Sequence, residues 1–129
     1  MLHISSQNIT LMAQLTEPAN SPLHVSTSFV DHWLNGQAVE YNAQMVLVSS
    51  MAATPIVSPP PALSVHRTVS HISAHSSDLQ AVAQVHLFYW DGTTKFTIVR
   101  VTLTPGSTLQ YEDGAGWSVI NSLGALRGG

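Results

Sequence analysis

The stretch from residue 79 to residue 120 alternates apolar and polar side chains and is interrupted by turn-forming glycines and prolines. Apolar residues take every second position in 81–87 and again in 99–103. The interruptions are Asp91-Gly92, Pro105-Gly106 and Gly114-Ala115-Gly116. Because strand side chains point alternately to the two faces of a sheet, this pattern is typical of an antiparallel meander with tight turns. The sequence therefore predicts an all-β fold.

Four further segments have strand character and precede the meander: Ile9–Leu15, Leu23–Asp31, Met45–Ser49 and Leu63–Ala74. A sustained 3.6-residue period is absent from the sequence, so we expect little helix. About eight strands with two proline-rich crossings predict a single antiparallel β-sandwich of jelly-roll type. The chain of 129 residues fits one such domain, spanning residues 1–129.

Three local signals refine this prediction. The apolar positions of Leu63–Ala74 change parity, which indicates a β-bulge between Val69 and Ile72. Pro59-Pro60-Pro61 is expected to be an extended connector that crosses between the sheets. Met45–Ser49 is apolar on both faces, which predicts a strand buried on both sides, and Leu34-Asn35-Gly36-Gln37 is expected to be a turn.

The amino-acid composition narrows the classes of partner that the chain is expected to bind. Charged residues make up only 9% of the chain, and the net charge is −3 with four basic residues, so we expect no nucleic-acid partner. Apolar runs are too short for a membrane span, and the N-terminus lacks the features of a signal peptide, so we expect a cytoplasmic origin and no membrane partner. The chain has no cysteine. A surface this poor in charge favours assembly, because the cores of interfaces are depleted in charged residues.

Reactive constellations are not evident in the sequence, so we expect neither an enzyme nor a cofactor. The serines lack a nucleophile-elbow setting, and the adjacent acids Glu112 and Asp113 fall in a turn. A histidine metal site formed by His66, His71 and His75 with His86 remains an alternative, although exposed histidines satisfied by water are the commoner outcome.

Aromatic residues suggest where a partner would bind. Phe88, Tyr89 and Trp90 are consecutive, so both faces of that strand carry a ring. In the next strand, Phe96 and Ile98 oppose the apolar face of 99–103. Apolar side chains on both faces of a hairpin predict that its outer face is covered in an assembly. The candidate interface residues are Phe88, Trp90, Phe96, Ile98 and Trp33.

The region from Pro59 to Gly124 resembles a group of small virion proteins of tailed bacteriophages. The pattern is a Pro/Ala segment, a strand with an arginine, a polar turn, an alternating strand, a Gly-centred hairpin and a C-terminal motif. That motif falls on Leu103, Gly106, Leu109, Tyr111, Asp113, Gly114, Gly116 and Trp117. Ser21–His32 is similar to the second strand of the group, so the resemblance spans most of the chain.

The resemblance implies a structural role in a phage particle, commonly as a capsid decoration, cement or head-fibre protein. We then expect a dimer or trimer that binds the major capsid protein on the capsid surface, after synthesis in the host cytoplasm. Met1–Asn8 and Ser122–Gly129 would be flexible arms that order on docking. The alternative is a tail-fibre or receptor-binding module that stacks carbohydrate on Trp33, Trp90 or Tyr89.

Overall fold

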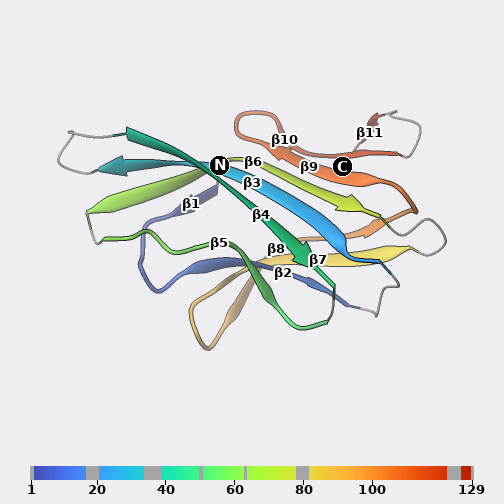
Figure 1. The fold of residues 1–129 in the computed structure, drawn as a ribbon, viewed down its shortest axis with the longest axis horizontal. Helices are drawn as coiled ribbons and strands as arrows, with labels where there is room; N and C mark the ends of the chain where they lie inside the picture. The colour runs from blue at the N-terminus through green and yellow to red at the C-terminus, as the bar shows by residue number, and fades with distance from the viewer. Residues whose placement is uncertain are drawn as a thin grey trace.

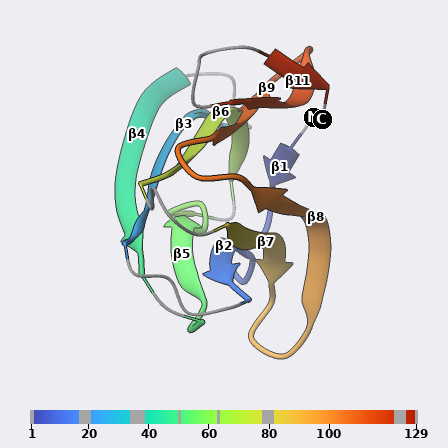
Figure 2. The same ribbon diagram turned by 90° about the vertical axis from the view of Figure 1, so that its right-hand side faces the viewer.

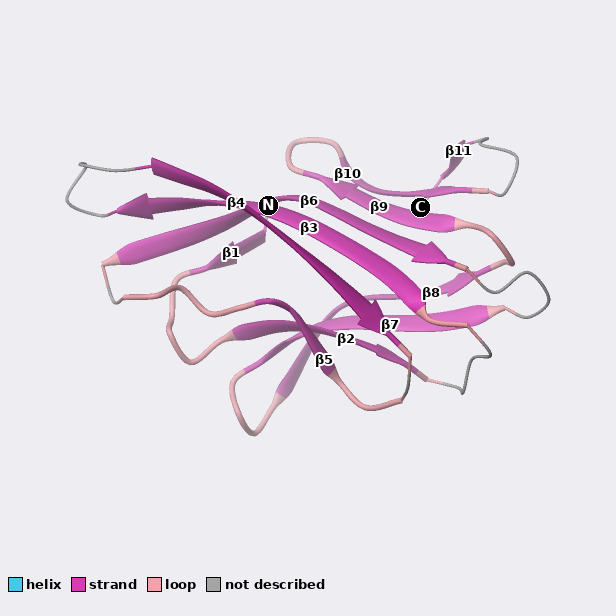
Figure 3. Ribbon diagram, viewed as in Figure 1, coloured by secondary structure: helices cyan, strands magenta, loops and turns pink. Residues whose placement is uncertain are grey.

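The computed structural model describes residues 2–16, 21–33, 39–49, 51–62, 64–77, 82–121 and, for the backbone alone, 126–128. Within these residues the chain forms strands joined by turns and no helix (Figure 3). The all-β prediction is confirmed. The strands are β1 (Leu2–Ile4), β2 (Thr10–Leu15), β3 (Leu23–Trp33), β4 (Val39–Val48), β5 (Thr54–Val57), β6 (Val65–Ser76), β7 (Ala83–Trp90), β8 (Lys95–Leu103), β9 (Thr108–Glu112), β10 (Gly116–Ile120) and β11 (Leu126–Gly128).

The strands form two antiparallel sheets that pack against each other, as predicted for a β-sandwich (Figures 1 and 2). The seven-stranded sheet A has the order β11-β10-β9-β6-β3-β4, with β1 also paired to β6. The four-stranded sheet B has the order β5-β2-β7-β8. In Figure 1, β2, β5 and β7 of sheet B lie below β3, β6 and β9 of sheet A.

The chain repeatedly passes from one sheet to the other. The consecutive pairs β2–β3, β4–β5, β6–β7 and β8–β9 each place one strand in sheet B and one in sheet A. The members of these pairs follow the same order in the two sheets: β4, β3, β6 and β9 in sheet A correspond to β5, β2, β7 and β8 in sheet B. The proline-rich segment joins β5 of sheet B to β6 of sheet A, so the predicted crossing is confirmed.

The prediction of one continuous meander was wrong at Pro105-Gly106. The β7–β8 hairpin belongs to sheet B, whereas β9 and β10 pair in sheet A. Gly106 has a φ of 77° and turns the chain, and the N–H of Ser107 donates to the carbonyl of Thr104 at 3.0 Å. The N–H of Ser76 then donates to the carbonyl of Ser107 at 2.9 Å. This turn therefore carries the chain between the sheets instead of forming a hairpin.

The core fills the space between the sheets. In β2 and β3 every second residue is buried, beginning at Leu11 and Leu23. Full burial of such a side chain stabilises the fold by about 1.5–3 kcal/mol relative to exposure. The largest fully buried side chains of the core are Ile4, Leu11, Leu15, Leu23, Ile56, Ile72, Leu87, Leu103 and Leu109.

The bulge predicted in β6 is confirmed at Ser70. Phe29 pairs with Val69 and Ser28 pairs with His71, so Ser70 is the extra residue. Val69 and Ile72 are consequently both buried although their parity differs. The Ser70 hydroxyl donates to the carbonyl of Ser28 at 3.0 Å. The bulge also divides one edge of β6, where β1 pairs on one side of Ser70 and β9 on the other.

The N-terminal segment is part of the fold, contrary to the flexible arm that we expected over Met1–Asn8. Leu2–Ile4 forms β1 against β6, and the side chains of Leu2 and Ile4 are buried. The Leu2 N–H also donates to the Tyr111 hydroxyl at 3.1 Å. Most of the predicted arm Ser122–Gly129 and the predicted turn Leu34–Gln37 lie outside the described residues, but the backbone of 126–128 pairs with β10.

Candidate interaction surface

The predicted interface residue Phe88 cannot reach a partner, which corrects our assignment. Core residues occupy the other parity of β7, so Phe88 lies on the outer face of sheet B, where it is nonetheless fully buried. The chain itself covers the ring. The Lys95 Nζ lies 5.0 Å from its centroid, and the His86 ring centroid lies 4.8 Å away. Long side chains can shield apolar surface in this way while their charged ends stay in water.

The other predicted interface residues are dispersed. Trp90 is half-buried on the outer face of sheet B, and Trp33 is half-buried at the end of β3 in sheet A. Ile98 is half-buried where the register of β7 and β8 shifts. Phe96 is half-exposed and, with Tyr89 and β1, lines a hollow of about 220 Å³. The structure therefore does not gather these residues into one surface.

The aromatic residues proposed for carbohydrate stacking are also separated. Tyr89 and Trp90 point to opposite faces of β7, and Trp33 belongs to the other sheet. Burial, chiefly, raises the pKa of Tyr89, although a backbone hydrogen bond with His3 acts in the opposite sense. These rings do not form a shared stacking platform.

The largest exposed apolar feature among the described residues lies on β4. Tyr41 is 81% exposed and Met45 is 84% exposed, while Val39 and Leu47 are each more than half exposed. Ala43, between them, is exposed too. All five have the same parity and point to the outer face of sheet A, and we call them the β4 row. Monomeric proteins rarely leave such a contiguous apolar row in water, so it is the candidate contact surface.

The β4 row corrects the expectation for Met45–Ser49. We predicted a short strand buried on both sides, but β4 has ten residues, and only Val48 is fully buried. The pairing of β4 with β3 decides which side chains of β4 point inward: Leu23 lies opposite Val48 and Val25 opposite Val46 on the inner face. The sequence signal was present in the alternation of apolar and polar residues over 39–45, but alternation alone does not tell which face is covered.

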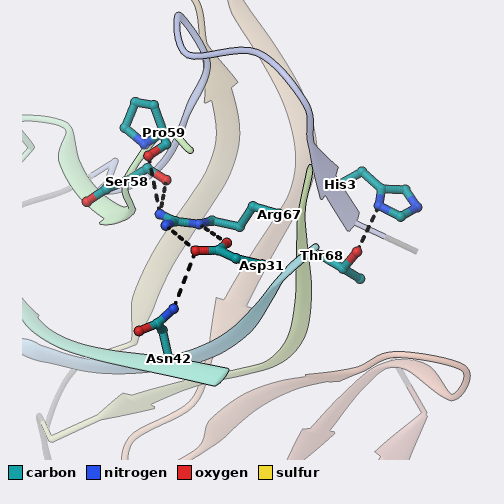
Figure 4. Close-up of polar contacts among 7 residues, drawn as sticks. All are labelled: His3, Asp31, Asn42, Ser58, Pro59, Arg67 and Thr68. Carbon is teal, nitrogen blue, oxygen red and sulfur yellow. Dashed lines mark hydrogen bonds and ion pairs between the residues drawn. The ribbon is translucent and has the colours of Figure 1, made fainter. Parts of the chain in front are cut away.

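A buried ion pair fixes the inner side of this region (Figure 4). Arg67 Nε and Nη2 donate to the Asp31 carboxylate at 2.7 and 2.8 Å. Arg67 Nη1 donates to the carbonyls of Ser58 and Pro59 at 2.8 and 3.3 Å, and Asn42 of β4 donates to Asp31 at 3.4 Å. The guanidinium thereby ties the proline-rich crossing to β3 and β6. This network explains structurally why the strand after the prolines carries an arginine.

Six histidines lie on the outer face of sheet A, among serine and threonine side chains. His24 lies directly opposite His75, and His32 lies directly opposite His66. The ring of His3 is 5.3 Å from that of His66, and His3 Nδ1 is 3.1 Å from the Thr68 hydroxyl, as Figure 4 shows. Together with His71, these are all the histidines except His86, which belongs to sheet B.

A histidine metal site would need at least three ligands close together. Over the described ranges, no three His, Cys, Asp or Glu side chains are arranged to hold a metal ion. The predicted combination of His66, His71 and His75 with His86 is not assembled, because His86 lies on the other sheet. Burial lowers the pKa of His86, and its Nε2 is 2.8 Å from the Thr97 hydroxyl.

The β4 row continues into a hollow of about 400 Å³ on the outer face of sheet A. Met45 and Leu47 form its apolar side, and His24 and His75 form part of its polar side. The candidate surface thus combines an apolar row at the edge of the sheet with hydrogen-bonding groups on β3 and β6. It carries little charge, and Glu40 is the sole charged residue of β4.

Comparisons of the chain with protein-family models, curated proteins and solved structures found no match. In the part of the chain that the structure describes, no helix is long and apolar enough to cross a membrane. Function is therefore inferred from the surface chemistry of the chain itself.

Proposed function

We propose that this chain is a structural subunit that assembles through the β4 row, and that it serves as a capsid decoration protein of a tailed phage. The observation that carries the proposal is the outward, exposed position of Tyr41, Met45 and their apolar neighbours on an edge strand. A subunit gains nothing for its own core from these side chains. They contribute only when a neighbouring molecule covers them.

The expected energy suits attachment in many copies. Full burial of an exposed apolar side chain stabilises a complex by about 1.5–3 kcal/mol. The four large side chains of the β4 row are 53–84% exposed, so covering them completely contributes roughly 4–8 kcal/mol per copy. Association costs about 4–15 kcal/mol in lost freedom of motion. One such contact is therefore weak, whereas several copies joined to each other and to a shell bind tightly through multivalency. A contact of this strength suits a subunit of a large assembly better than a protein that binds its partner tightly as a single copy.

The virion setting is supported by the resemblance of Pro59–Gly124 and Ser21–His32 to small phage virion proteins. The low charge of the chain agrees with surfaces that lie against other subunits. The partners would be further copies of the chain and the major capsid protein. The position of the β4 row on one face leaves the opposite face, sheet B, for solvent.

The test of assembly compares variants at two exposed apolar positions. A Tyr41→Ser/Met45→Ser variant should be monomeric by light scattering at concentrations where the wild type is oligomeric. Phe96→Ser is the matched control, because Phe96 is also exposed but lies on β8. A monomeric wild type, or equal loss of assembly in the control, would contradict the proposal.

The virion setting is tested separately by cosedimentation with shells assembled from the major capsid protein encoded near this gene. Saturable binding that the Tyr41→Ser/Met45→Ser variant weakens at least tenfold supports the proposal. Either the lack of a capsid gene in the neighbourhood or the absence of binding to such shells would overturn the capsid role.

A further inference from the structure

Among the strands that the structure describes, β4 is the last on one side of sheet A, and β3 is its neighbour there. The ten residues of β4 pair with β3 without a register shift. A strand in this position has one row of backbone N–H and C=O groups directed away from its neighbour. β4 is therefore long and regular enough to accept another strand.

The other edges of the two sheets carry the devices that discourage pairing. β5 has four residues, includes Pro55 and shows a register shift against β2. β8 carries Lys95 and Arg100 and has a register shift against β7. β11 has three residues. Prolines, bulges, short strands and basic residues are the usual protection of an edge, and β4 has neither proline nor a basic residue.

We propose that a second copy of the chain pairs with β4 in antiparallel fashion about a two-fold axis at Ala43. This inference rests on the proposed assembly function and specifies its contact. In that register Ala43 meets its own counterpart, Tyr41 lies beside Met45 of the second copy, and Val39 lies beside Leu47. The register pairs every member of the β4 row with another apolar member. Two-fold interfaces require this kind of self-complementarity.

Charge and packing favour the same register. Glu40 lies opposite Val46 of the second copy, so the two carboxylates do not face each other. A Met sulfur beside a Tyr ring is a favourable contact, and the small Ala43 side chain leaves room at the axis. The two sheets A become one continuous sheet. Side chains of the two β4 strands then cover each other only along their flanks, so the two β4 rows merge into a single apolar surface on the outer face, and the shell of the proposed function would cover that surface.

Disulfide trapping tests this register directly, because the chain has no cysteine of its own. Residues directly opposite in an antiparallel pair have Cα atoms about 4.5–5.5 Å apart, within disulfide range. The two copies of residue 41 would instead lie four residues out of register, roughly 13 Å apart. Ala43→Cys should therefore give a covalent dimer under mild oxidation, whereas Tyr41→Cys and Met45→Cys should crosslink only when mixed.

Thr102→Cys is the control, because Thr102 is exposed on the other long edge strand, β8. We expect at least tenfold more covalent dimer from Ala43→Cys than from this control. If light scattering shows an oligomer but Ala43→Cys does not crosslink, the register is wrong while assembly stands. If Tyr41→Cys crosslinks alone as well as Ala43→Cys does, the antiparallel arrangement is wrong. A monomeric wild type would overturn both the register and the assembly function.

Discussion

Replacing Arg67 by methionine should destabilise the fold by about 3–5 kcal/mol, because the Asp31 carboxylate is then buried without its counterion. The Arg67 and Asp31 side chains are 9% and 3% exposed. The substitution removes two charge-assisted hydrogen bonds and also the donors to the carbonyls of Ser58 and Pro59. The guanidinium carbon lies 4.3 Å from the Phe29 ring centroid, and methionine keeps most of that packing. Electrostatics and hydrogen bonding therefore account for most of the loss.

Urea denaturation followed by circular dichroism measures the free energy of unfolding of each variant. Arg100→Met is the matched control, because Arg100 is exposed on β8, and it should change stability by less than about 0.5 kcal/mol. The double variant Asp31→Leu/Arg67→Met removes both charges, and it should recover most of the roughly 3–5 kcal/mol lost in Arg67→Met because apolar replacement of a buried ion pair is often neutral or stabilising. A loss below about 1 kcal/mol for Arg67→Met, or a double variant no more stable than the single one, would refute the role assigned to this pair.

Three further results are expected. Burial lowers the pKa of His86, so the unfolded chain binds a proton more readily than the folded chain does, and the free energy of unfolding should fall as the pH drops below about 6.5. In denaturation measured at about pH 7.5 and 5.5, His86→Phe should show a smaller pH dependence than the wild type. Tyr111→Phe leaves the buried N–H of Leu2 without its acceptor and should cost about 1–2 kcal/mol, with faster amide hydrogen exchange in β1; unchanged exchange would exclude this anchor. The Tm of the wild type should rise with protein concentration, whereas that of Met45→Lys should not, since binding of a second copy stabilises only the folded state; a Tm that shifts equally in both would contradict the β4 contact.

The local sequence pattern was sufficient to predict those features of a strand that depend only on which of its two faces is buried. Burial alternates along β2 and β3, and the parity change of β6 correctly predicted a bulge between Val69 and Ile72, where Ser70 is the extra residue. These features depend on which face of a single strand is buried, and that information lies within a few residues. The same holds for the proline-rich crossing, because three consecutive prolines exclude a central strand.

Features that depend on distant residues could not be predicted. A turn such as Pro105-Gly106 looks the same whether the next strand pairs in the same sheet or joins the other one, so the meander was assigned to a single sheet. The three residues of β1 are too few to show a period, and their burial depends on the pairing of β1 with β6. Phe88 was assigned to an interface because the sequence does not show that Lys95 and His86 cover its ring.

The β4 row shows why the sequence pattern and the structure together motivate the proposed assembly. Residues 39–45 alternate as a half-buried strand should, and every odd position from 39 to 47 is apolar. In the folded chain these side chains point outward, while the polar Asn42 points inward and donates to Asp31. β4 cannot turn these apolar side chains inward, because a shift of its pairing with β3 by one residue would turn Val48 out of the core. A strand whose apolar face is turned to solvent is best explained by a neighbouring molecule that covers this face, which is the arrangement that we propose.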